Sequence, residues 1–276
     1  MFENRTLVIA TKHHKEKVIR PLFETDLGVK CFAPDDFNTD ALGTFTGEIE
    51  RKDSSYETVK KKCLIAMEET DCDLGIASEG SFGNHPVLFM ASADEELLIF
   101  IDKKNDLEIV VRELSLETNF NTATVNSTEE LNDFAKLSNF PSHGLILKDL
   151  TNQNLYKGIQ SWKELEEKAN LLFKENSSFI VETDMRALYN PTRMKVIEKA
   201  AIELLSKIKS LCPECQTPGF GVVKAISGLP CEWCKSKTKS IYSHLYQCQK
   251  CKYELEKKFP NGKETEDPMY CDFCNP

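Results

Sequence analysis

The chain has no long hydrophobic run and no excess of positive charge. None of its apolar stretches approaches the roughly 20 residues that a membrane-spanning helix needs. Its 35 lysines and arginines face 44 aspartates and glutamates, and the net charge of −9 argues against non-specific coating of nucleic acid. A strand-like run begins at residue 6, and no signal-peptide pattern precedes it. These absences predict a cytoplasmic globular protein that does not enter membranes.

Cysteine is scarce in the first 209 residues. The three present, Cys31, Cys63 and Cys72, have apolar neighbours, which is typical of buried and inert thiols. This region instead alternates strand-like and helix-like patterns. We therefore expect residues 1–209 to form an α/β domain and residues 210–276 to form a separate, small, β-rich domain.

The region 210–276 is rich in cysteine, with eight residues in four Cys-x-x-Cys pairs. In a chain without an export signal, such pairs indicate metal ligands rather than disulfides. Thiolates at this spacing suit tetrahedral zinc, and four of them close the coordination shell of one ion. The sequence therefore predicts two structural zinc ions, held by Cys212, Cys215, Cys231, Cys234, Cys248, Cys251, Cys271 and Cys274.

The pairing of these four Cys-x-x-Cys pairs has two solutions. Consecutive pairing leaves spacers of ordinary length between the pairs of each site. Crossed pairing joins the first pair to the third and the second to the fourth. It follows if residues 219–226, 239–247 and 252–259 form three antiparallel strands, because the pairs then lie alternately at the two ends of the sheet. We favour the crossed pairing.

The residues 73–86 are a candidate ligand-binding segment. The apolar run 74–77 predicts a buried strand, and residues 78–86 contain two glycines, Glu79, two serines and His85. We expect 78–86 to be a loop, because α/β sheets bind ligands in loops at the carboxyl ends of strands. Glu79 would then lie exposed at the mouth of a crevice, with residues 87–91 forming the next strand. The alternative is a glycine-rich turn with a solvated glutamate.

A basic loop follows the first predicted strand, residues 6–10. Lys12, His13 and Lys15 lie there, directly before a helical pattern. A helix N-terminus attracts anions, so these residues predict a phosphate-binding loop. The alternative is a solvated basic turn, although positive charge is unfavourable at that end of a helix. After a second strand, residues 35–53 form a polar loop that includes Arg51, and Ser54 is expected to cap the next helix opposite Glu57.

Two resemblances are visible in longer motifs. The segments Gly-Leu-Pro-Cys-Glu-Trp-Cys at 228–234, Thr-Asp-Met-Arg-Ala at 183–187 and Asn-Pro-Thr-Arg-Met at 190–194 resemble a bacterial family of unknown function, which implies no activity. Residues 6–205 resemble the inosine/xanthosine triphosphate pyrophosphatase superfamily. The motifs that carry this second resemblance are Thr-Lys-His-His-Lys at 11–15, Glu-Thr at 57–58, Glu-Gly-Ser at 79–81 and the segment 183–193.

The match to that superfamily is incomplete. Lys12 replaces an asparagine of its motif, Ser81 replaces a glycine or a shifted carboxylate, and an Asn-Ala-x-x-Lys-Ala pattern is not kept. The resemblance implies a two-lobed α/β domain with a mixed sheet and a central groove for a nucleotide. It implies the fold more strongly than the reaction.

The resemblance also implies a hydrolytic site. Cleaving a phosphoanhydride requires Mg²⁺ or Mn²⁺ on carboxylates, a positioned water and cations on the phosphate oxygens. The carboxylates would be Glu57 and Glu79, with Asp73 third. The phosphate would be bound by Lys12, Lys15 and Arg193. Either His85 or His13 would act as the general base. Simpler roles exist, since Glu57 could only cap its helix and Arg193 could only pair with Asp184.

Three functions therefore remain open. The first is a metal-dependent hydrolase of nucleotide phosphates with a structural zinc tail, and the second is a nucleotide-sensing protein without turnover. The third is a module that binds nucleic acid or protein through the tail, on Lys235, Lys237, Lys239, Tyr242, His244 and Tyr246. We do not favour the third, because the last three share one strand face and the tail is nearly neutral. The oligomeric state does not follow from the sequence.

Overall fold

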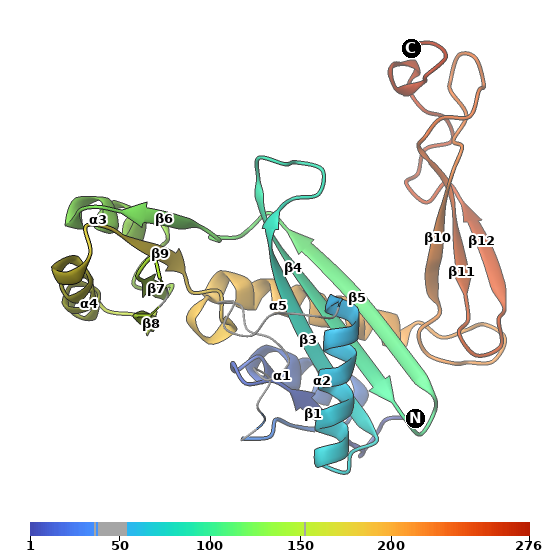
Figure 1. Ribbon diagram of the computed structural model, residues 1–276. Helices are drawn as coiled ribbons and strands as arrows, with labels where there is room; N and C mark the ends of the chain where they lie inside the picture. The colour runs from blue at the N-terminus through green and yellow to red at the C-terminus, as the bar shows by residue number, and fades with distance from the viewer. Residues whose placement is uncertain (36, 38–53, 152) are drawn as a thin grey trace. The chain divides into compact units, whose positions relative to one another are not determined.

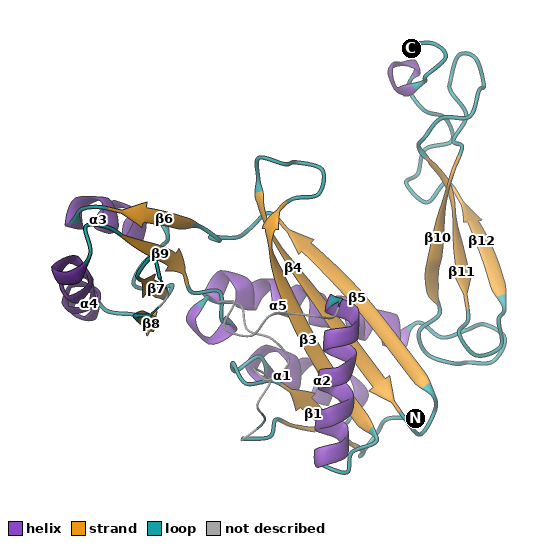
Figure 2. Cartoon of the chain, in the orientation of Figure 1, coloured by secondary structure: helices purple, strands orange, loops and turns teal. Residues whose placement is uncertain are grey.

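The chain forms two compact units, Met1–Leu204 and Leu205–Pro276. The structure, a computed structural model, describes all residues except 36, 38–53 and 152 (Figure 1). The first unit is mixed α/β and the second is a cysteine-rich β region (Figure 2). The predicted polar loop lies almost wholly outside the described residues, together with Arg51. Within the described residues, no helix has the length and apolar character that crossing a membrane requires.

The main sheet of the first unit has five strands in the order β2-β1-β3-β4-β5. β1 runs parallel to β2 and β3, whereas β3, β4 and β5 form an antiparallel meander. β1 pairs with β3 only as far as Ala10 and Ala77, and β3 continues beyond that point against β4. The strands are β1 (Thr6–Ala10), β2 (Lys30–Phe32), β3 (Leu74–Asn84), β4 (Ser92–Asp102) and β5 (Leu107–Ser115).

The helix α2 (Ser55–Glu69) covers one face of this sheet and contributes Val59, Cys63 and Met67 to a buried core. Its start was predicted correctly: the Ser54 hydroxyl accepts the Glu57 backbone N–H at 3.2 Å. Cys63 is fully buried, and burial raises the pKa of its thiol, in accord with an inert role. Burial likewise raises the pKa of Cys31 to about 12. The helix α1 (Glu16–Leu27) follows β1.

A smaller sheet has the order β6-β9-β7-β8 and packs with two helices. Ser127 and Ser161 cap these helices by accepting backbone N–H groups three residues ahead. A last helix, α5 (Pro191–Lys209), follows this sheet. The elements are β6 (Thr122–Val125), α3 (Thr128–Leu137), β7 (Leu145–Lys148), β8 (Leu155–Ile159), α4 (Trp162–Glu175) and β9 (Phe179–Thr183).

Two predictions around the β3–β4 hairpin are wrong. Residues 78–84 belong to β3 rather than to a loop, and residues 87–91 form no strand. Continuous pairing of β3 with β4 hydrogen-bonds the backbone of 78–84, and the glycines are accommodated within the strand. The turn is held by His85, whose Nδ1 accepts the N–H groups of Val87 and Leu88. The apolar run 87–90 is therefore exposed at the hairpin turn.

The second unit contains a three-stranded antiparallel sheet in the order β10-β11-β12. Its strands are β10 (Gly221–Ser227), β11 (Ile241–Gln247) and β12 (Glu254–Lys258), so the three strands predicted for the tail are confirmed. Its buried cluster is small, consisting of Phe220 with Cys212 and Cys248. Tyr246 lies 5.8 Å from Phe220 and Tyr242 lies 5.4 Å from Phe259 between ring centroids, so both tyrosines contribute to packing.

Candidate functional sites: two cysteine tetrads and a buried charge cluster

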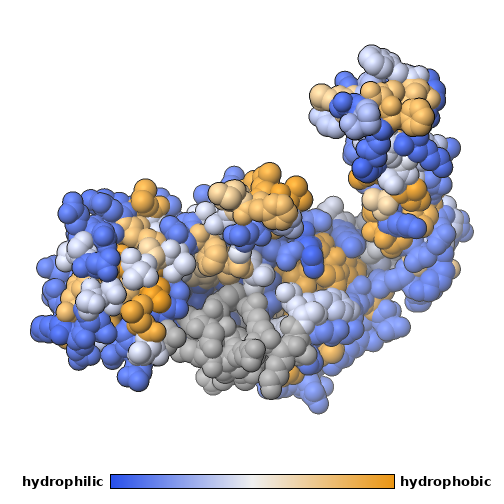
Figure 3. Space-filling model, turned by 45° about the horizontal axis from the view of Figure 1, so that its top comes forward, coloured by the Kyte–Doolittle hydropathy of each residue, from blue (hydrophilic) through white to orange (hydrophobic). Residues whose placement is uncertain are grey.

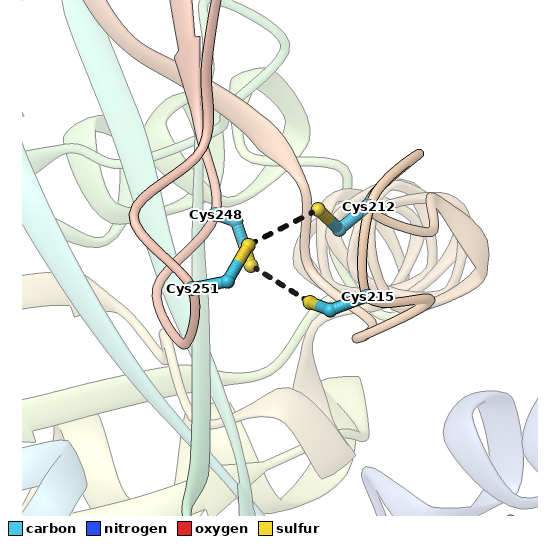
Figure 4. Close-up of side chains that lie close together, drawn as sticks. All are labelled: Cys212, Cys215, Cys248 and Cys251. Atoms are coloured by element: carbon cyan, nitrogen blue, oxygen red, sulfur yellow. Dashed lines mark hydrogen bonds between the residues drawn. The ribbon is translucent and has the colours of Figure 1, made fainter.

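The first cysteine tetrad joins the first and third Cys-x-x-Cys pairs. Cys212 and Cys215 precede β10, and Cys248 and Cys251 lie in the turn between β11 and β12. Their side chains point toward one another (Figure 4). The Sγ atoms of Cys212 and Cys251 are 3.6 Å apart, as are those of Cys215 and Cys248. The crossed pairing is therefore the one that the structure adopts.

The second tetrad joins the second and fourth pairs in the same manner. Cys231 and Cys274 lie 3.8 Å apart and Cys234 and Cys271 lie 3.6 Å apart, measured between Sγ atoms. In each tetrad all four Sγ atoms lie within 4.8 Å of one another. A tetrahedron with Zn–S bonds of about 2.3 Å has S···S edges of about 3.8 Å. Both tetrads therefore fit a zinc ion with a closed shell of four thiolates.

A neighbouring hydroxyl favours the thiolate form in each tetrad. The Thr217 hydroxyl lies 3.1 Å from Cys215 Sγ, and this contact is the main cause that lowers the pKa of Cys215 to about 6. Ser236 has the same role beside Cys234 and lowers the pKa of that thiol to about 6.

In the same tetrads the pKa values of Cys251 and Cys274 are raised to about 12. For Cys251, the Tyr253 backbone lowers the pKa, but burial and the neighbouring thiols outweigh this effect. For Cys274, the Cys234 thiol is the main cause of the raised pKa. Each tetrad therefore holds one thiol that ionises readily, and the thiolate is the form that binds metal.

A cluster of buried charges lies in the first unit, where β1 ends and β3 continues. Lys15, the residue before α1, is buried, and its Nζ donates to the Ser78 hydroxyl at 2.7 Å. The same Nζ lies 3.9 Å from Glu96 Oε2. Burial is the main cause that lowers the pKa of Lys15 to about 8, against the opposing effect of Glu96. Lys15 is therefore desolvated, and the alternative of a solvated basic turn does not hold for this residue.

Glu79 belongs to this cluster but is not exposed. It is 2% exposed and forms an ion pair with Lys62, which reaches it from α2. The expectation of an exposed Glu79 at a crevice mouth is therefore wrong. Side chains alternate along a strand, and Glu79 shares the face of Ala77 that α2 covers.

Arg193, at the start of α5, lies against the opposite face of β3. Its Nε donates to Glu96 Oε1 at 2.5 Å and its Nη1 donates to the Met185 carbonyl. A Cβ at Gly80 would lie 2.3 Å from the guanidinium, so only glycine allows this approach. The alternative partner proposed for Arg193, Asp184, instead pairs with Arg186 at 2.6 Å.

Asp94 completes the cluster and lies two residues from Glu96 on the same face of β4. It is fully buried, and neither carboxylate oxygen has a hydrogen-bond partner in the part of the chain that the structure describes. Burial, followed by the charge of Glu96, raises the pKa of Asp94 to about 7. A buried carboxylate without a hydrogen-bond partner lowers the stability of the fold. A protein that retains such a group needs a reason for it, such as a functional role or a bound ion.

Other predicted site residues lie outside the cluster. Asp73 precedes β3 and pairs with Arg5 at 3.0 Å, at the far end of the β1–β3 pairing. Glu57 is exposed in the first turn of α2, and Lys12 is exposed after β1. His85 holds the β3–β4 turn, and His13 lies half-buried in the loop before α1. The structure thus brings Lys15 and Arg193 of the predicted set together at Glu96, whereas Glu79 lies on the opposite face of β3 with Lys62.

Three members of the cluster were not predicted: Lys62, Asp94 and Glu96. A signal for the two acids exists, because the segment 94–96 places three consecutive carboxylates directly before an apolar run on a buried strand. Lys62 has a weaker signal, since it lies one residue before Cys63 on the apolar face of α2.

Residues 62–276 match a family described as a domain of unknown function, DUF6671. The chain belongs to this family. No curated protein matches it. Among solved structures, protein VC0702 from Vibrio cholerae is 12% identical, covering 74% of this chain and 94% of its own, with a TM-score of 0.33. That score is too low to carry an argument, and the pyrophosphatase resemblance remains a prediction.

The substitution Asp94→Asn is expected to stabilise the protein at pH 8. The folded-state pKa of about 7 lies above the ordinary value of 3.8, so the folded chain binds more protons between these values and loses stability as pH rises through them. An amide removes this loss, and the free energy of unfolding should rise by about 2–4 kcal/mol at pH 8 and little at pH 4. Denaturant titrations at both pH values measure the difference.

The control is the adjacent Glu95→Gln. Glu95 lies on the other face of β4 and pairs with Arg112 at 3.1 Å near the surface, so its loss should cost less than about 1 kcal/mol. Equal effects of Asp94→Asn at pH 4 and pH 8 would show that Asp94 carries no buried charge.

Proposed function

We propose that the first unit binds a nucleotide or a related phosphoanhydride and hydrolyses it with a divalent cation, while the second unit is a structural zinc module. The buried charge cluster carries this proposal. Lys15, Lys62 and Arg193 come from three separate helical segments and meet the carboxylates of β3 and β4. Burying each ion costs several kcal/mol, and strongly shifted pKa values concentrate at functional sites.

Lys15 is the residue best placed for a phosphate. It directly precedes α1, where backbone N–H groups favour an anion and a bare ammonium is unfavourable. Its lowered pKa shows that its present partners do not fully compensate for its burial. A phosphate oxygen would supply the missing negative charge, and the Ser78 hydroxyl would offer a neighbouring hydrogen bond.

The cation would be held by Asp94 and Glu96. Within the described residues, only the cysteine tetrads bring three or more metal-ligating groups within reach of one ion. Mg²⁺ is commonly held by one or two carboxylates together with water and substrate phosphates. The partnerless oxygens of Asp94 fit that role. When bound, the cation would neutralise charge on the phosphate oxygens.

The test is a panel of nucleoside triphosphates with Mg²⁺ or Mn²⁺, assayed for binding and for release of pyrophosphate and phosphate. Lys15→Met should lower affinity at least about tenfold, since one buried charge-assisted contact is lost. Its stability at pH 7 should be retained or raised, because a pKa below the ordinary 10.5 means that the ammonium destabilises the folded chain.

The matched control is Lys17→Met, which removes an exposed lysine two residues further along. It should bind and turn over as the unmodified protein does. Binding without release would favour nucleotide sensing over hydrolysis. An absence of binding by any member of the panel would overturn the proposal.

A further inference from the structure

The two tetrads differ at one position of their Cys-x-x-Cys pairs. The residue before the second cysteine is Glu214 or Lys250 in the first tetrad, but Trp233 or Phe273 in the second. Both tetrads have the same sulfur geometry, so an aromatic residue at this position is not needed to hold a metal. The aromatic side chains of the second tetrad therefore have another use.

These aromatic side chains are exposed rather than packed. Trp233 is 75% exposed and Phe273 is 80% exposed, and Met269 and Tyr270 beside them are 59% and 61% exposed. We call residues 228–240 and 262–276, which surround the second tetrad, the aromatic end. Figure 3 shows apolar residues gathered on its surface. A concentration of exposed apolar side chains on a small unit is typical of an interaction surface.

The charges of the aromatic end select the partner. It contains four lysines and five carboxylates, and a zinc ion with four thiolates adds a charge of −2. A carboxylate directly precedes each aromatic residue: Glu232 before Trp233 and Asp272 before Phe273. Lys239 pairs with Asp272 at 2.9 Å, but both side chains are highly exposed, so this pair is weak. The local charge repels phosphates and attracts cations.

We propose that the aromatic end binds a basic peptide segment of a partner protein. Arginine guanidinium groups stack on tryptophan and phenylalanine rings through cation–π attraction, and a nearby carboxylate adds to that attraction. Aromatic residues are also the usual energetic centre of a protein interface. This surface belongs to the second unit and is independent of the nucleotide chemistry proposed for the first.

The test gives the second tetrad the residue types of the first, in the zinc-loaded chain of residues 1–276. The double variant Trp233→Glu, Phe273→Lys carries at these positions the residue types that the first tetrad has, and its net charge is unchanged. The probe is a fluorescent arginine–serine repeat peptide, with a glutamate–serine repeat and a single-stranded oligonucleotide for comparison. Val223→Thr, at a 56% exposed site on β10, is the control.

The arginine–serine peptide should bind the unmodified chain and the control equally, and the double variant about tenfold more weakly, with two zinc ions retained in all three. If the double variant bound the arginine–serine peptide as tightly as the unmodified chain does, negative charge alone would explain the attraction. That result would overturn the proposal. A preference for the oligonucleotide over the arginine–serine peptide would overturn it as well. A Phe273→Asn single variant, which also leaves the net charge unchanged, provides the comparison if the double variant loses zinc.

Discussion

Removing the metal is expected to unfold the second unit while the first remains folded. The buried cluster of the second unit consists of Phe220 and two ligand cysteines, with three half-buried residues packed against it. Such a core is too small to offset the conformational entropy of folding. Structural zinc contributes roughly 10–16 kcal/mol at pH 7, so the second unit should be folded only with metal. The first unit has its own cores and should not depend on it.

Elemental analysis of the purified chain should give two zinc ions. A strong chelator should then make residues 205–276 sensitive to proteolysis and leave the first unit resistant. Cys215→Ser should release one ion, because it removes one ligand of the first tetrad. Cys72→Ser, which changes a half-buried cysteine outside both tetrads, should release none. One ion or none per chain, or the absorbance of an iron–sulfur cluster, would contradict the zinc assignment.

The features that local sequence determines were predictable. Ser54, Ser127 and Ser161 are helix caps because a hydroxyl placed before a helical pattern accepts a nearby N–H, whatever the rest of the chain does. The crossed tetrads follow from the strand pattern of the second unit, since antiparallel strands return successive Cys-x-x-Cys pairs to alternate ends. In both cases the information lies within a few residues or one sheet.

The buried charge cluster depends on contacts that no local pattern contains. Arg193 and Glu96 are 97 positions apart, and Lys15 and Ser78 are 63 apart. Gly80 suggested a loop, but it is required because the Arg193 guanidinium lies directly against the strand. Glycine satisfies both requirements, so its presence did not distinguish a turn from a close approach. Only the tertiary contacts determine that Glu79 is buried.

The substitution Glu79→Gln is expected to destabilise the protein strongly. The glycine-rich pattern of residues 78–86 predicted an exposed carboxylate in a loop. Glu79 is instead paired with Lys62, whose side chain is 10% exposed. The amide would leave the Lys62 ammonium buried without its charged partner, which typically costs about 3–5 kcal/mol. Denaturant unfolding at pH 7 measures this loss of stability. The hydrolysis rates of the variant and the unmodified protein should be compared at a temperature where the variant is folded.

Two further variants separate the ion pair from other effects. The double variant Lys62→Met, Glu79→Gln removes both charges and should recover most of the lost stability, because replacing a whole buried pair is often nearly neutral. Glu108→Gln breaks another lysine–glutamate pair of α2, with Lys60 at 2.6 Å, but that pair is partly exposed. Its loss should cost no more than about 1 kcal/mol. If Glu79→Gln were as mild as Glu108→Gln, the Lys62–Glu79 pair would be solvated in solution rather than buried.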